Sequence, residues 1–114
     1  MELKIVAQYP ENMSAKDKYD LMRSPKTQRM QDMKGQRLEV SAYMIREETN
    51  GEGEVSTIVS VKTKDGDLVA TNSKTFLQEF EAIVECVGAS DFALDVLDGV
   101  SRAGRHYVTC AWAD

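Results

Sequence analysis

Residues 55–88 read VSTIVSVKTKDGDLVATNSKTFLQEFEAIVECVG and contain most of the information about the fold. The β-branched segment VSTIVSVKT predicts a strand, KDGD (64–67) predicts a hairpin turn, and LVAT predicts a second strand. An Asn72 or Ser73 cap then begins an amphipathic helix, whose apolar residues recur at helical spacing and which ends at Gly88. This stretch therefore predicts strand, hairpin, strand and helix, in that order.

Further strands are predicted on both sides of this stretch. In RLEVSAYMI (37–45) apolar and polar side chains alternate, which is typical of a strand with one face on a core. FALDVLDG (92–99) and RHYVTCAW (105–112) predict two antiparallel strands joined by the turn SRAG. Three strands, a helix and a two-strand hairpin form the element order of the OB-fold, a five-stranded Greek-key barrel. We therefore expect a mainly β protein (α+β in content) with an OB-fold barrel and its helix between strands three and four.

The N-terminal residues predict a different local structure. Ser14 can cap a short helix, and Ser24-Pro25 is typical of a second helix start. A chain of 114 residues with 42% hydrophobic residues fits a single core. We expect residues 1–34 to form a helical extension packed on the barrel, and residues 35–114 to form the OB-fold domain.

Composition excludes several classes of function. The net charge of −5 argues against binding nucleic acid through total charge. The apolar runs are too short to span a membrane, and MELKIVAQYP lacks the apolar core of a signal peptide, so the cytoplasm is expected. Two cysteines without Cys-x-x-Cys spacing and a single histidine predict no metal site, no cofactor and reduced, buried thiols.

The order and spacing of several short motifs carry a family resemblance. GQRLEVSAYMI, then VSTIVSVKTKDGDLVATNSKTFLQEFEAIVE and LDGVSRAGRHYVTC, resemble the single-stranded DNA-binding proteins of small tailed phages that replicate by protein priming. The resemblance covers about residues 35–110. It implies a non-enzymatic protein that coats and protects single-stranded DNA during phage DNA replication in the bacterial cytoplasm. It makes a replicative DNA polymerase and further copies of the chain, bound cooperatively on DNA, the candidate protein partners.

The charge distribution and strand parity predict the DNA-binding residues. Residues 23–46 carry six basic and two acidic side chains, whereas residues 76–98 carry six acidic and none basic. A single-strand binder needs cations for phosphates and flat side chains for bases. Parity places Tyr43 and Tyr107 off the core face, where each would stack a base or fill the barrel edge. The predicted site residues are Arg37, Tyr43, Arg46, Lys62, Lys64, Arg102, Arg105, His106 and Tyr107.

The sequence also bears on two other classes of function, an enzyme and a protein-interaction module. The best pair of catalytic residues that the sequence offers is His106 and Cys110. They are four residues apart on one strand, or about 13 Å, which is too far for a nucleophile–base pair. Trp112 falls on the same strand face as Cys110, which favours packing in the core or at the barrel end over stacking on a base. The alternative to DNA binding is an OB-like protein-interaction module or inhibitor that uses its acidic helix face, Glu79, Glu81 and Glu85.

Overall fold

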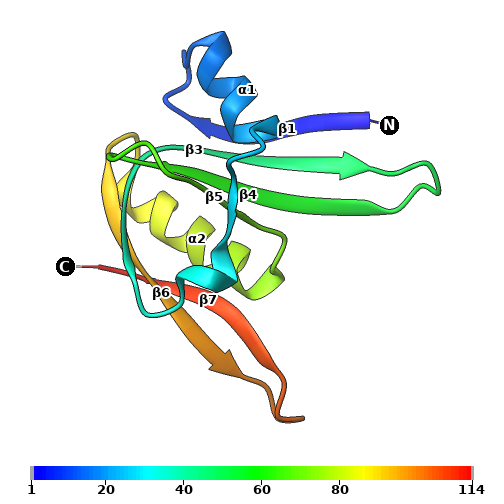
Figure 1. Ribbon diagram of the computed structural model, residues 1–114, viewed down its shortest axis with the longest axis vertical. Helices are drawn as coiled ribbons and strands as arrows, with labels where there is room; N and C mark the ends of the chain where they lie inside the picture. Colours follow the sequence, from blue (N-terminus) through cyan, green and yellow to red (C-terminus); the bar gives the residue numbers. More distant parts are fainter. Residues whose placement is uncertain (1, 114) are drawn as a thin grey trace.

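The computed structural model describes residues 2–113, which form one curled, open β-sheet and two α-helices (Figure 1). The strands are β1 (Glu2–Tyr9), β2 (Gln28–Arg29), β3 (Arg37–Thr49), β4 (Val55–Thr63), β5 (Leu68–Thr71), β6 (Phe92–Val100) and β7 (His106–Trp112). The helices are α1 (Ala15–Arg23), the short 3-10 helix η1 (Met30–Met33) and α2 (Lys74–Val87). The sheet order is β2-β5-β4-β3-β6-β7, and β1 pairs with β3. Residues 2–113 are therefore mainly β and barrel-like, with seven strands rather than the expected five.

Helix α2 fills the hollow of the curled sheet. Its apolar residues Phe76, Phe80 and Ile83 are buried in the main core against side chains of β3, β4, β6 and β7. Figure 1 shows α2 between β4–β5 and the β6–β7 hairpin. The Ser73 hydroxyl accepts a hydrogen bond from the Phe76 N–H (3.3 Å), and Gly88 with φ of 75° ends the helix. The amphipathic helix predicted from the sequence is confirmed.

The predicted strand connections are also confirmed. Strands β3, β4 and β5 pair antiparallel as a meander, and β6 pairs antiparallel with β7. Between β4 and β5, the Thr63 N–H donates to the Asp67 carbonyl (2.9 Å) while Gly66 adopts φ of 91°, a conformation that favours glycine. The turn predicted at residues 64–67 is therefore the one that forms.

A bulge in β3 reverses its side-chain parity. Val40 lies opposite Thr63 but Ala42 lies opposite Lys62, so Ser41 is an extra residue on β3, and its hydroxyl bonds the carbonyls of Lys62 and Thr63 (3.1 and 3.3 Å). Residues before the bulge face the main core at even numbers, and residues after it face that core at odd numbers. The single alternation predicted for residues 37–45 is therefore wrong beyond Ser41.

Helix α1 covers the opposite, outer face of β3–β5. Leu21 and Met13 pack there on Ala42, Met44 and Leu68 in a second, smaller core. Figure 1 shows α1 on the far side of β3 and β4 from α2. The helix begins where the sequence predicts, because the Ser14 hydroxyl accepts from the Asp17 N–H (3.1 Å).

The rest of the N-terminal region differs from the expected helices. Ser24-Pro25 begins a turn, in which the Thr27 N–H donates to the Ser24 carbonyl (3.2 Å), and not a second α-helix. The chain then pairs in parallel with β5 as the short strand β2 and continues into η1. Strand β1, which is not among the predicted strands, pairs along residues 43–49 of β3. Residues 2–34 thus add two strands to the sheet.

The two cysteines differ in environment. Cys110 is buried, and burial raises the pKa of its thiol to about 12. Cys86 on α2 is exposed, so the expectation that both are buried is wrong for Cys86. Helix α2, with 14 residues, is the longest helix within residues 2–113. No helix in this range is long and apolar enough to cross a membrane.

Candidate nucleic-acid interface

The turn between β6 and β7 presents two arginines. The Ser101 N–H donates to the Arg105 carbonyl (2.9 Å), the Ser101 hydroxyl accepts from the Arg105 N–H (3.2 Å), and Gly104 adopts φ of 81°. This compact turn exposes Arg102 and Arg105. Neither forms an ion pair with any residue between 2 and 113. Both guanidinium groups are therefore available to an anion.

Tyr107 lies flat across the neighbouring strand. It is directly opposite Gly99 in the β6–β7 ladder and half-buried. A Cβ atom at Gly99 would overlap Cε2 and Cζ of the Tyr107 ring and lie 2.7 Å from its Oη. The ring therefore occupies the space that a side chain at position 99 would take. One ring face rests on the backbone of β6, which leaves the other as the face that can meet a ligand.

The residues next to Tyr107 continue this surface. We call the outer hairpin face the side of β6–β7 that carries Asp95, Leu97, Gly99, Tyr107 and Thr109, since these alternate with the buried Val96, Val108 and Cys110. Leu97 is 40% exposed, which gives the face an apolar position beside the tyrosine. Asp95 is ion-paired with Arg37 of β3 (3.2 Å), so its charge is offset.

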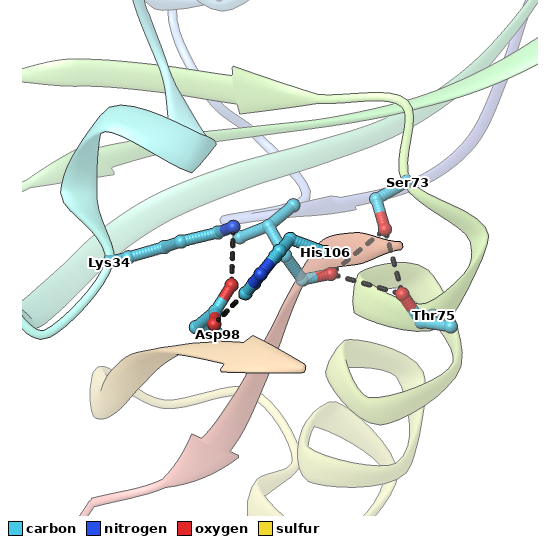
Figure 2. Close-up of polar contacts among 6 residues, drawn as sticks. Lys34, Ser73, Thr75, Asp98 and His106 are labelled. Atoms are coloured by element: carbon cyan, nitrogen blue, oxygen red, sulfur yellow. Dashed lines mark hydrogen bonds and ion pairs between the residues drawn. The ribbon is translucent and has the colours of Figure 1, made fainter. Parts of the chain in front are cut away.

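The opposite side of the hairpin is tied to the body. Figure 2 shows the Asp98 carboxylate between Lys34 (2.7 Å) and His106 (2.9 Å). The hydrogen bond from Lys34 and then that with His106 hold the pKa of Asp98 below its usual value. The Ser73 and Thr75 hydroxyls donate to the Val108 carbonyl (2.9 and 3.0 Å), which fixes the start of α2 to β7 (Figure 2). These contacts hold the hairpin close to its turn, and the exposed His106 is already paired with Asp98.

Tyr43 is not on the surface. Its side chain is 5% exposed, with ring centroids 5.1 Å from Phe80 and 6.3 Å from Phe92. Burial raises the pKa of its hydroxyl. The prediction that Tyr43 lies off the core face is wrong because the bulge at Ser41 turns it inward, and a residue so buried cannot stack a base.

Arg46 is buried as well. Its guanidinium donates to the Ser60 hydroxyl (2.8 Å) and to the carbonyls of Leu21 and Met22 at the end of α1 (3.2 and 3.4 Å), and it pairs with Glu48 (3.3 Å). These bonds satisfy carbonyls at the helix C-terminus, where a cation is favoured. Arg46 therefore attaches α1 to the sheet and is not exposed to solvent as the prediction required.

Lys62 of β4 and Lys64 of the turn after it do not belong to the β6–β7 hairpin. Lys62 forms an ion pair with Asp17 of α1 (3.1 Å), and this hydrogen bond lowers the pKa of Asp17. Lys64 is exposed beside a hollow of about 480 Å³ that Arg37 also lines, together with Glu39, Asp65 and Asp67. Of the predicted residues, the structure brings Arg102, Arg105 and Tyr107 together on the hairpin, with Arg37 further along the same face.

Sequence reasoning missed Gly99 and Leu97. The signal for Gly99 was present, because a glycine inside a predicted strand often marks the close approach of another group. Leu97 alternates with buried residues and therefore falls on the outer face, but a single leucine does not reveal that it stays exposed. Trp112 lies opposite the buried Leu94, on the strand face that the sequence predicts, yet it is 54% exposed, so the expected packing is wrong for this residue.

No known protein family, curated protein or solved structure matches this chain. Within residues 2–113, no group of three or more His, Cys, Asp or Glu side chains is arranged to hold a metal ion.

Proposed function

We propose that the protein binds single-stranded DNA without sequence preference, through the tip and outer face of the β6–β7 hairpin. The observation that carries the proposal is the Tyr107 ring, which lies flat over Gly99 in a hairpin whose Arg102 and Arg105 are exposed without an ion pair among residues 2–113. A flat aromatic face next to free cations matches the two needs of a single-strand binder, since bases stack on rings and phosphates meet cations.

Base stacking favours single strands over duplex. A base stacked on a tyrosine contributes about 1–3 kcal/mol, and every base has a flat face, so the contact does not select a sequence. In a duplex the bases are already stacked and paired, and their flat faces are not accessible to Tyr107. The exposed Leu97 offers an apolar neighbour for the next base along the outer hairpin face.

The phosphates are held by few cations. Arg102 and Arg105 take phosphates at the hairpin tip, and Arg37 offsets the charge of Asp95 further along the face. With so few contacts, one protomer binds weakly, and dense coverage needs neighbouring protomers to bind cooperatively. The resemblance to the phage proteins adds the biological setting, which is the coating and protection of single strands during phage DNA replication.

The proposal includes an OB-type arrangement within the seven-stranded sheet. Strands β3, β4 and β5, helix α2 and strands β6 and β7 follow the OB order. In that fold the face of the second and third strands and two loops, one joining the last two strands, bind oligonucleotides. Here α1 packs on the outer face of β3–β5, and the exposed loop between β3 and β4 carries Glu52 and Glu54, so the basic loop between β6 and β7 is the part of this surface that suits DNA.

The test replaces Tyr107 with leucine, which keeps bulk and removes the aromatic face. Affinity for fluorescently labelled oligo(dT), measured by anisotropy, is expected to fall about 5- to 150-fold, the equivalent of 1–3 kcal/mol. Tyr19→Leu is the matched control, because Tyr19 is 54% exposed on α1, away from the hairpin. Equal losses in both variants, or no loss in Tyr107→Leu, contradict the assignment of the site.

A second candidate function is docking of a basic protein partner on α2. Glu79, Glu81 and Glu85 are exposed without an ion pair among residues 2–113, and the single tryptophan, Trp112, is 54% exposed on β7, which packs along α2. If the chain fails to bind oligo(dT) but an oligo-arginine peptide changes Trp112 emission, and E79Q/E81Q/E85Q abolishes that change, the second candidate replaces the first.

A further inference from the structure

The backbone conformation at position 99 does not require a glycine. Five of the seven glycines adopt positive φ, a region that side chains rarely enter, whereas Gly51 and Gly99 do not. Around Gly51 the space for a Cβ is open. At Gly99 that space is filled by the ring of Tyr107. Position 99 therefore demands glycine because of a neighbouring side chain.

We infer that Gly99 is a positioning residue that holds Tyr107 flat as a platform for one base. This inference rests on the proposed function, because it specifies how the single-strand site is built. Without a Cβ at position 99, the ring can cross β6 and rest on its backbone. The ring is thus ordered before DNA arrives, and DNA does not bear the cost of ordering it. Preordering one such side chain is worth about 2- to 12-fold in affinity.

A methyl group at position 99 must move the ring. The backbone of β6 cannot retreat easily, because Asp98 pairs with Val108 and Val100 pairs with His106 on either side of the Gly99–Tyr107 pair. The half-buried ring is the freer partner and has to tilt away from the strand. Its flat face then no longer lies along the outer hairpin face. Alanine is otherwise acceptable in a strand, so Gly99→Ala should fold.

The experiment is a double-mutant cycle on the full chain with labelled oligo(dT) as the probe. Gly99→Ala is expected to weaken binding at least 2-fold, up to the loss seen for Tyr107→Leu. If Gly99 acts only through the ring, adding Gly99→Ala to Tyr107→Leu changes the affinity no further. Gly51→Ala is the matched control and leaves the affinity unchanged, because its Cβ meets open space and its φ is not positive. Tyr107→Phe keeps the ring and should keep binding.

A spectroscopic readout checks the ring position itself. The Gly99 α proton that takes the place of a side chain points at the Tyr107 ring, so its NMR resonance should be shifted upfield by the ring current. Tyr107→Leu should return it to an ordinary position, whereas Tyr107→Phe should not. A normal Gly99 resonance in the wild-type protein overturns the inference, since the ring would not lie over the glycine.

The binding outcomes separate this inference from the proposed function. If the wild-type chain does not bind oligo(dT) at low salt, the proposed function fails and the inference fails with it. If the wild-type chain binds and Tyr107→Leu binds weakly, while Gly99→Ala binds like wild type, the inference alone is overturned. Loss of binding in Gly99→Ala that persists to the same degree in the Tyr107→Leu background also overturns it, because Gly99 would then act without the ring.

Discussion

Replacing Arg102 and Arg105 together with alanine should change how DNA affinity depends on salt. Each phosphate contact on single-stranded DNA contributes about −0.7 to the slope of log affinity against log salt. The two guanidinium groups are exposed and form no ion pair within residues 2–113, so both contacts are free to form in the wild type. The double variant should therefore have a slope about 1.4 less steep.

This difference in slope translates into a measurable change in relative affinity. Over a fourfold rise in salt, from about 50 to 200 mM, the advantage of wild type over the variant should shrink about 7-fold. The assay is fluorescence anisotropy of labelled oligo(dT) at several salt concentrations. Circular dichroism of both proteins verifies that the hairpin variant remains folded.

The matched control removes the same charge elsewhere. Arg23 and Lys26 are exposed at and just beyond the end of α1, and replacing both with alanine lowers the net charge equally. This control should keep the wild-type slope, because the contacts are local to the hairpin. Identical slopes for the wild type and the Arg102/Arg105 variant, or equal changes in both variants, would refute the reasoning.

Three further predictions concern the body of the protein. Arg46→Ala should lower the free energy of unfolding by at least about 1–3 kcal/mol in urea denaturation, because it leaves the buried polar groups that it bonds without a partner. Asp98→Asn should destabilise the fold at neutral pH, because the hydrogen bonds from Lys34 and then with His106 lower the folded-state pKa of Asp98. That contribution is present above the carboxyl group's ordinary pKa near 4 and disappears as pH falls through the lower folded value, so the two stability curves should converge in acid. Native protein should react with Ellman's reagent at one thiol, the exposed Cys86, while denatured protein reacts at two, because Cys110 is buried and the pKa of its thiol is raised to about 12.

Local signals were sufficient to predict much of the fold. The cap at Ser73, the end of α2 at Gly88 and the turn at residues 64–67 each depend on a few neighbouring residues, and all three occur in the structure. Strand β1 is harder to find in this way, because its apolar residues Leu3, Ile5 and Val6 remain exposed and its pairing with residues 43–49 is non-local. Alternation of apolar and polar residues is a weak signal for a strand that buries few of its side chains.

The candidate site was harder to predict than the fold, because one inserted residue in a strand moves every later side chain to the opposite face of the sheet. Ser41 has no sequence feature that marks a bulge, and its effect on Tyr43 depends on how β3 pairs with β4. Arg46 was misassigned for the same reason, together with the docking of α1 over it. Tyr107 and the two hairpin arginines were placed correctly because β7 is regular and the turn that precedes it is short.

The central claim is that the chain binds single-stranded DNA, and one titration tests it directly. The wild-type protein is titrated with oligo(dT) and, separately, with a duplex of equal length, at about 50 and 200 mM salt, while tyrosine and tryptophan emission is followed. The account predicts quenching by the single strand that weakens at the higher salt, with weaker binding of the duplex. No change in emission and no binding at the lower salt, or equal affinity for duplex, would contradict it.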